Sequence, residues 1–199
     1  MKVITSIISK CDPPTKDHQR RVSLLAVQIG RQLSLSSGQI DDIRVISLVH
    51  DIGKVILPTE FMVKTTDLNP DERKIVRNHP QVGFDMLNGT GFSDTIKQAV
   101  LQHHEHIDGS GYPNNLTGGQ ILTEAKIVTV ADVVDAITSN RPYNPQLDIE
   151  DALIELSDHK GTYYDPNIVE ACERIFRDAV QFGKFTAVEC FLGQQPARC

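Results

Sequence analysis

The sequence predicts an all-α protein that folds as one compact helical bundle. Apolar residues recur at intervals of three and four along most of the chain, which is the spacing of one face of a helix. Helix-capping residues stand before several of these segments, and no set of alternating strands is present in the sequence. With 40% hydrophobic and 23% charged residues, the composition is that of a globular protein with a sizeable core.

The first two predicted helices lie near the N-terminus. Periodic apolar residues predict a helix from about residue 16 to 34. Ser36 and Gln39 stand at capping-box spacing and open a second helix, which is expected to stop near Gly53. His50 falls on the apolar stripe of this second helix, at its inward end.

The middle of the chain carries further helix signals and one loop. Asn69 and Pro70 open a helix with a cap, a proline in the first turn and acidic residues after it. This helix must end before Pro80, because a residue that precedes proline avoids the helical region, and a short helix is expected to resume afterwards. Residues 93–104 are predicted to be helical, whereas residues 105–120 form a glycine-rich loop.

The C-terminal part contains the most continuous apolar segment, residues 125–140. Its β-branched residues would suit a strand, but its length and apolar character favour a buried helix, with Thr123 as the cap. Asp148 caps the next predicted helix, and another is predicted over residues 165–180. Residues 181–199 are left as an unassigned C-terminal tail.

Charge and composition exclude several classes of function. Twenty Lys and Arg against 26 Asp and Glu give a net charge of −6, which argues against a general DNA-binding protein. No apolar stretch approaches the roughly 20 residues that span a bilayer, and the N-terminus does not resemble a signal peptide. A cytoplasmic protein is therefore expected. The cysteines are too scattered to predict a disulfide framework or a cysteine zinc site: Cys11, Cys172, Cys190 and Cys199.

The first chemical signal is a histidine–aspartate pair at the end of the second predicted helix. An unpaired carboxylate such as Asp51 is very costly in an apolar core, so a cation or a metal must compensate its charge. Lys54 lies one turn further on and offers the simplest solution, a buried ion pair with Asp51. His50 taken alone would more often be a core histidine than a metal ligand.

Further histidines favour a metal site. His103 and His104 diverge by about 100° on a helix, so both cannot lie on one narrow buried stripe, but they can converge on a metal at a helix end. This donor set suits iron, manganese, zinc, nickel or cobalt, and two carboxylates can serve a pair of ions. His106 and His159 are interpreted as surface or loop residues without a role. Other donors stand at similar inward positions on separate predicted helices: His18, His79 and Asp132.

The motifs occur in a specific order along the chain. This series resembles the HD-GYP family, a branch of the HD-domain metal-dependent phosphohydrolases, over about residues 18–179. The resemblance implies a helical bundle of the HD-domain type, with a catalytic domain over residues 1–180. Family members typically hydrolyse cyclic di-GMP, and some act on cyclic GMP-AMP. The motifs are His50-Asp51-x-x-Lys54, His79-Pro80, His103-His104-Glu105, Asp108-Gly109-Ser110-Gly111-Tyr112-Pro113, Ala131-Asp132-x-x-Asp135-Ala136 and Arg141-Pro142-Tyr143.

The resemblance implies two divalent metal ions, with iron or manganese expected first and zinc, nickel or cobalt as alternatives. A water or hydroxide shared by the ions would attack the phosphorus, with Asp51 and Lys54 as the catalytic residues. One ion would be held by His18, His50, Asp51 and Asp132, and the other by Asp51 as the bridge together with His79, His103 and His104.

The resemblance also implies a set of substrate-binding residues. Lys54 and Arg141 match positions that hold the substrate phosphate. The loop around Tyr112 would shape the substrate. The alternative is a tight turn that needs Gly109 and Gly111 at positive φ, and both interpretations can hold together. Asp135 either orients a metal ligand or the attacking water, or is a plain supporting acid. The complete set is Lys54, Gly111, Tyr112, Pro113, Asp135 and Arg141.

Two departures from the family pattern matter. Asn144 stands three residues after Arg141, where relatives often carry a basic residue, which weakens the predicted phosphate clamp. Pro14 stands where one sub-branch carries a glutamate that helps hold a third metal. Asp12 and Asp17 are expected to point away from the ligand face, so two ions are predicted rather than three.

Three functions compete at this point. A cyclic-dinucleotide phosphodiesterase that produces linear pGpG, and then GMP, is favoured because every two-metal ligand position is filled. A nucleotide hydrolase of the wider HD class and a degenerate HD module that binds partners without catalysis are the alternatives. Expected partners are a regulatory sensor or receiver domain, or a cyclase-domain protein, and a homodimer is left open.

Overall fold

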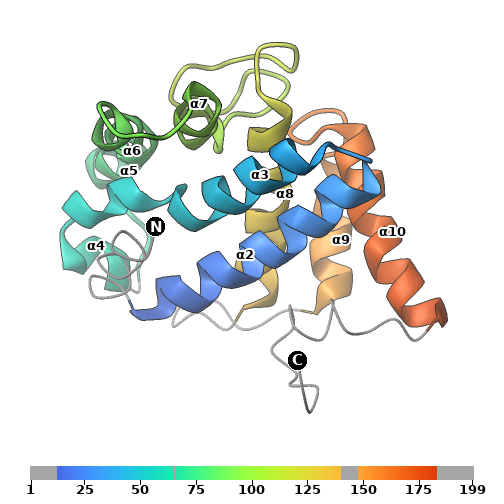
Figure 1. The fold of residues 1–199 in the computed structure, drawn as a ribbon. Helices are drawn as coiled ribbons and strands as arrows, with labels where there is room; N and C mark the ends of the chain where they lie inside the picture. The colour runs from blue at the N-terminus through green and yellow to red at the C-terminus, as the bar shows by residue number, and fades with distance from the viewer. Residues whose placement is uncertain (1–12, 65, 140–147, 183–199) are drawn as a thin grey trace.

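The computed structural model describes residues 13–64, 66–139 and 148–182, and within them the protein is a bundle of helices (Figure 1). No strand occurs in these ranges, where only isolated β-bridges are found. The all-α prediction is therefore confirmed. The elements are α2 (Pro13–Gln32), α3 (Ser37–Val49), the 3₁₀ helix η1 (Ile52–Ile56), α4 (Thr59–Val63), α5 (Pro70–Val76), α6 (His79–Leu87), α7 (Asp94–Gln102), α8 (Thr123–Thr138), α9 (Ile149–Asp158) and α10 (Pro166–Phe182).

Side-chain caps start several helices where the sequence predicts them. The Ser36 hydroxyl accepts the Gln39 N–H before α3, and the Gln39 side chain accepts the Ser36 N–H in return. Asn69 and Glu72 form the same reciprocal pair before α5, at 2.9 Å in both directions. Asp148 is the N-cap residue of α9. Each such cap typically stabilises a helix by about 1 kcal/mol.

The segment with β-branched residues is the buried helix α8, as predicted, but its cap is not the predicted one. Thr123 is the first helical residue, and Leu122 occupies the N-cap position without a side-chain cap. The backbone N–H of Leu122 donates instead to Oε1 of Gln102 at 2.9 Å, so the start of α8 is tied to the end of α7. A contact between distant segments replaces the local cap.

The second predicted helix ends earlier than expected. α3 stops at Val49, and after Asp51, at φ −94° and ψ 10°, the chain continues as η1. The chain packs closely at this point, since a Cβ on Gly53 would lie 2.0 Å from the backbone oxygen of His79. Only glycine allows η1 to contact α6 in this way, and the contact brings Asp51 close to His79.

The break around the His79-Pro80 dipeptide is confirmed. α5 ends at Val76, and α6 begins at His79 itself, one residue before the proline. Pro80 therefore lies in the first turn of α6, where its missing N–H has no helical partner to lose.

The helices pack around one apolar core. α2 lies along α3, and α8 packs against both from behind, while α6 packs on α7 and η1 at one end of the molecule (Figure 1). α9 and α10 cover α8 at the other end (Figure 1). None of the described helices is long and apolar enough to cross a membrane. Fully buried core side chains include Ile29, Ile43, Ile46, Leu87, Ile127 and Leu156.

Candidate metal centre

The predicted ligands lie together, although they come from five separate segments. His103 and His104 lie just beyond the end of α7, where they leave the regular helix and can face the same site. The others come from α2, the α3–η1 junction, α6 and α8. They are His18, His50, Asp51, His79 and Asp132.

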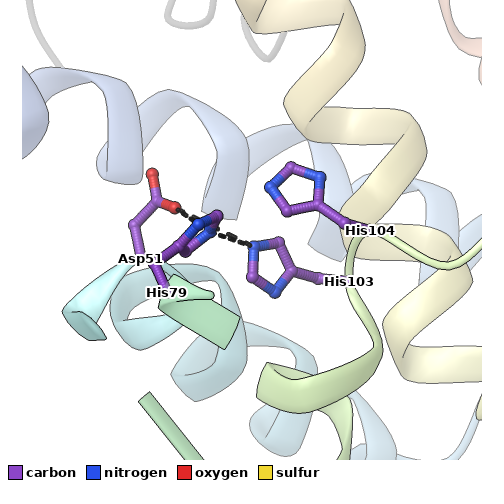
Figure 2. A group of neighbouring side chains, drawn as sticks. All are labelled: Asp51, His79, His103 and His104. Atoms are coloured by element: carbon purple, nitrogen blue, oxygen red, sulfur yellow. Dashed lines mark hydrogen bonds and ion pairs between the residues drawn. The ribbon is translucent and has the colours of Figure 1, made fainter. Parts of the chain in front are cut away.

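One group of donors surrounds the Oδ1 side of Asp51. The ligand atoms of Asp51, His79, His103 and His104 all lie within 4.8 Å of one another (Figure 2). His79 Nε2 is 3.2 Å and His103 Nε2 is 3.8 Å from Asp51 Oδ1. The two Nε2 atoms are 3.3 Å apart, which places both imidazoles edge-on to the same small volume. We call these residues the inner group.

A second group of donors faces the other oxygen of the same carboxylate. His50 Nε2 lies 3.5 Å and His18 Nε2 lies 3.9 Å from Asp51 Oδ2, and the three ligand atoms lie within 4.8 Å of one another. Asp132 Oδ1 is 3.2 Å from His18 Nε2 and 3.9 Å from His50 Nε2. These residues form the outer group. Asp51 thus belongs to both groups, one oxygen toward each, as a bridging carboxylate requires.

Three of the imidazoles are held by the main chain in the same way. Nδ1 of His50, His79 and His103 lies 2.9, 2.8 and 2.7 Å from the backbone oxygen three residues earlier in each case. A carbonyl oxygen only accepts hydrogen bonds, so each Nδ1 carries the proton. In the neutral ring the lone pair of Nε2 is then left for a metal, and these contacts fix the orientation of each ring.

His18 is held by a carboxylate instead. Its Nδ1 donates to Oδ2 of Asp135 at 2.7 Å, and Arg21 grips the same carboxylate with Nε at 2.6 Å and Nη2 at 3.1 Å. Nη2 of Arg21 also donates to Ser139 Oγ at 2.8 Å. The Asp135 side chain is fully buried and both of its oxygens are occupied. Of the roles left open for Asp135, these contacts fit a residue that orients a ligand, His18.

Burial keeps several imidazoles neutral. It lowers the pKa of His50, and it lowers that of His103 still further, with the neighbouring His104 as the next cause. Burial, followed by the charge of His79, lowers the pKa of His104 to about 3. Neutral imidazole is the form that binds metal, so these rings are ready to act as ligands at neutral pH.

The carboxylates are held in their charged form. Burial raises the pKa of Asp51, but Lys54 and His50 outweigh it and hold the pKa well below its usual range. Burial also raises the pKa of Asp132, but the hydrogen bond from His18 outweighs this effect. The pKa of Asp132 therefore also lies far below its usual range. For His18, burial lowers the pKa, but hydrogen bonds to Asp132 and Asp135 raise it to about 9.

The donor set fits divalent metal ions. The plain alternative, an Asp51–Lys54 ion pair, does form, with Lys54 Nζ 2.6 Å from Oδ2. It does not account for the rest of the site, because Asp51 Oδ1 and His50 Nε2 are buried atoms without a hydrogen-bond partner. Leaving such atoms unsatisfied typically costs about 1–3 kcal/mol each. Ions between the rings and the carboxylate would satisfy both atoms, and imidazole with carboxylate suits iron, manganese or zinc.

The glycine-rich loop packs directly against the inner group. The Tyr112 ring stacks on the His104 ring with centroids 4.8 Å apart, and the Tyr112 N–H donates to the His104 backbone oxygen at 3.0 Å. Pro113 follows Tyr112 through a cis peptide bond and is half-buried. Gly109 has the predicted positive φ, at 84°, but Gly111 does not. Gly111 is needed for another reason, since a Cβ there would lie 2.3–2.5 Å from backbone atoms of residues 104–106.

The remaining predicted site residues lie partly within and partly outside the described ranges. Lys54 is 30% exposed, so its ammonium can be reached from outside the site. Arg141 and Asn144 lie outside the described residues. Asp17 is exposed on α2, as the sequence predicts, while Asp12 lies outside the described part of the chain.

The sequence interpretation missed residues that support the site. Glu105 is 2% exposed, and its carboxylate accepts the N–H groups of Asn114 and Leu116 at 2.6 and 2.9 Å, which fixes the loop beside His104. The sequence signal that could have identified Glu105 is its position directly after the two histidines of the His-His-Glu motif. Gly53 was noted only as a helix stop, although it sets the approach of η1 to α6.

The histidines interpreted as having no role form a packed stack. His106 and His159 lie on either side of Tyr163, with ring centroids 4.2 and 4.4 Å from it. The backbone N–H of Ile107 also donates to the backbone oxygen of Tyr163 at 3.2 Å. Both histidines lie outside the helices and are partly exposed, as the sequence predicts, and their stacking attaches the glycine-rich loop to the turn between α9 and α10.

The described helices form a bundle whose central site combines imidazoles with a shared aspartate, an arrangement that is typical of metal-binding proteins. Comparison with known families identifies which class of these proteins the chain belongs to. A model of the HD domain family matches residues 2–168, and the chain belongs to that family. The predicted resemblance is confirmed by curated relatives that carry the name cyclic di-GMP phosphodiesterase.

Individual relatives agree with this assignment. The cyclic di-GMP phosphodiesterase response regulator RpfG of Xanthomonas campestris is 37% identical over 82% of this chain and 44% of its own length. The 3′3′-cGAMP-specific phosphodiesterase 2 of Vibrio cholerae is 34% identical over 78% of this chain and 30% of its own length. The chain thus spans less than half of either relative. The crystal structure of a cyclic GMP-AMP-specific phosphodiesterase of V. cholerae shares the fold, with a TM-score of 0.66 at 21% identity over 90% of this chain and 49% of that one.

Proposed function

We propose that the protein is a metal-dependent phosphodiesterase that hydrolyses a cyclic dinucleotide, with cyclic di-GMP as the expected substrate and linear pGpG, then GMP, as products. The observation that carries this proposal is the position of Asp51 between two sets of imidazoles, one oxygen toward each. Relatives that match most of the chain are named for this activity, which supports the same conclusion.

The inner and outer groups would each hold one divalent ion. When bound, a pair of ions acidifies a shared water and neutralises charge on a phosphoryl group. The contribution of the chain is to fix the ligands: main-chain carbonyls orient His50, His79 and His103, and Asp135 orients His18. Iron or manganese is the expected metal, with zinc, nickel or cobalt as alternatives.

Lys54 would bind the substrate phosphate once an ion takes over the charge of Asp51. Its ammonium is partly exposed and lies at the edge of the bridging carboxylate. A cation there stabilises the negative charge that builds on the phosphoryl oxygens in the transition state. Arg141 is assigned the same task from its place in the sequence alone. Tyr112, packed on His104, would form part of the wall beside the reacting phosphate.

Two alternatives differ in substrate or in kind. Cyclic GMP-AMP is the second candidate substrate, because a relative of V. cholerae is named for it. A catalytically weak HD module that only binds partners is disfavoured, because both ligand groups are complete within the described residues.

The proposal extends to the setting of the enzyme. Residues 1–180 would form the catalytic domain, regulated by a sensor or receiver domain or by a cyclase-domain protein, in the cytoplasm. The buried free thiol of Cys172 is compatible with a reducing compartment. These partners and a homodimer remain predictions.

The activity can be tested directly. Protein reconstituted without oxygen with iron, and separately with manganese, is incubated with cyclic di-GMP and with 3′3′-cyclic GMP-AMP, and the products are resolved by chromatography. We expect cyclic di-GMP to be converted to pGpG faster than cyclic GMP-AMP is cleaved. Metal-loaded protein that leaves both substrates intact would contradict the proposal, whereas faster cleavage of cyclic GMP-AMP would reassign the substrate.

A further inference from the structure

A groove with a volume of about 490 Å³ lies on the surface around α5. Three of its lining residues are cationic, Arg73, Lys74 and Arg77, and the other two are Leu68 and Pro70. The three cationic side chains are exposed. The groove therefore combines positive charge with a small apolar wall, a combination that suits a ligand with both a phosphate and a flat ring.

The positive charge of this groove is not neutralised by the protein. Within the described part of the chain, Arg73, Lys74 and Arg77 form no ion pair. The adjacent carboxylate of Glu72 is already engaged, because it pairs with Lys64 and accepts the Asn69 N–H.

The spacing of the cations places them side by side. Arg73 lies in the last turn of α5 and Arg77 is its C-cap residue, four positions later, so the two lie on one face at the C-terminal end of the helix. The helix dipole favours cations at this end. An anion bound here would contact both guanidinium groups.

The groove is connected to the metal centre through stacked side chains. The guanidinium carbon of Arg77 lies 5.1 Å from the centroid of the Tyr112 ring, and the other neighbour of that ring is the His104 imidazole, at 4.8 Å. Arg77 also precedes His79, the first residue of α6, by only two positions. One end of the groove therefore reaches the wall of the inner group.

We propose that this groove binds the half of the cyclic dinucleotide that is remote from the phosphate under attack. A cyclic dinucleotide holds two phosphodiesters and two purines in one ring, so the second phosphate must lie outside the metal centre when the first lies within it. Arg73, Lys74 and Arg77 would contact that second phosphate, and the guanidinium and apolar surfaces would pack on a purine. This proposal rests on the proposed function and adds a second substrate contact to it.

The test uses two substrates that differ in the part the groove would bind. Cyclic di-GMP has the second phosphate, whereas bis(p-nitrophenyl) phosphate has only the one that is cleaved. The variant is the double substitution Arg73→Ala, Lys74→Ala in the metal-loaded protein. The matched control is Arg174→Ala, Arg177→Ala, which removes the same charge from exposed arginines of α10 at the opposite end of the molecule (Figure 1).

We expect the groove variant to raise KM for cyclic di-GMP by about 10-fold, with kcat little changed, because it loses ground-state contacts to the second phosphate. Its kcat/KM for bis(p-nitrophenyl) phosphate should stay within about twofold of wild type, and the control should leave KM for cyclic di-GMP unchanged. Arg77→Ala alone should shift KM in the same direction.

The outcomes separate this proposal from the one on which it rests. If wild type cleaves cyclic di-GMP and the groove variant has the same KM, or if activity on both substrates falls equally, the groove proposal is wrong while the proposed function stands. An equal rise in KM in the α10 control would show general electrostatic attraction and would also overturn it. If wild type leaves cyclic di-GMP intact, the proposed function fails and the groove proposal fails with it.

Discussion

The inner and outer groups of the metal centre share Asp51 but are built from different kinds of support. In the inner group, His79 and His103 are almost fully buried and are oriented by backbone oxygens of the turns that precede them. In the outer group, His50 is buried and held by a backbone oxygen in the same way, but His18 is 12% exposed and is oriented by Asp135, which is itself held by Arg21. The groups therefore differ through His18.

The difference separates a fixed half of the site from an adjustable half. Main-chain carbonyls cannot be altered by substitution, and the neutral rings of His103 and His104 bind a metal without releasing a proton. The raised pKa of His18, about 9, means that its proton must be displaced before the ring can bind an ion. Metal affinity is therefore expected to be tuned through the outer group.

The largest effect is expected where the two groups meet. Asp51→Ala removes the one carboxylate that, among the described residues, belongs to both ligand groups, so the variant should lose metal from both groups and lose hydrolysis by roughly 10³-fold or more. Elemental analysis and product chromatography measure the two losses, and circular dichroism should show that the helices persist. The exposed Asp158→Ala at the end of α9 is the control and should change neither quantity. Full turnover in Asp51→Ala would show that no bridge exists.

A smaller effect is expected beside the bridge. Lys54→Ala should lower kcat/KM for cyclic di-GMP by roughly 10²-fold while metal content stays unchanged, because Lys54 is assigned to the substrate phosphate. Lys64→Ala provides a matched control, since Lys64 is similarly exposed, at 29% against 30%, but pairs with Glu72 away from the ligands. Loss of metal from the Lys54 variant would mean instead that the Asp51–Lys54 pair is structural.

The smallest expected effect tests the comparison between the inner and outer groups. Asp135→Asn keeps the shape of the side chain but removes the charge behind His18, and it should weaken binding of the outer ion by about 10–100-fold. The inner ion should be retained, so a metal titration should separate into one unchanged and one weakened step. Ser139→Ala removes the hydroxyl that Arg21 contacts, one step further from His18, and should have a smaller effect. Equal weakening of both steps would contradict the division into a fixed and an adjustable half.

Local signals in the sequence were sufficient for most of the helices and for most candidate ligands, but they did not predict η1 or α4. Periodicity and caps such as Ser36 and Asn69 predict elements correctly because they depend on residues within one or two turns. The ligands were recognisable because buried imidazoles and carboxylates need partners, and their order in the chain matches a family pattern. The cap of α8 failed because Gln102 on α7 takes its place, a contact between distant segments.

The supporting residues were harder to predict for the same reason. The contact of Asp135 with His18 joins α8 to α2, across 117 positions of the sequence, and nothing near Asp135 indicates it. Gly53 is needed for its distance from α6, and Gly111 for its distance from residues 104–106, which only the folded chain defines. The stack of His106, Tyr163 and His159 likewise depends on the turn between α9 and α10.

The central claim is that two ions flank Asp51, and anomalous diffraction from crystals of the metal-loaded protein tests it most directly. We expect two peaks, one among His79, His103 and His104 and one among His18, His50 and Asp132, with elemental analysis giving close to two ions per chain. A single peak would contradict the bridging role of Asp51. A third fully occupied peak coordinated by Asp12 or Asp17 would contradict the prediction, drawn from Pro14, that the site holds two ions rather than three.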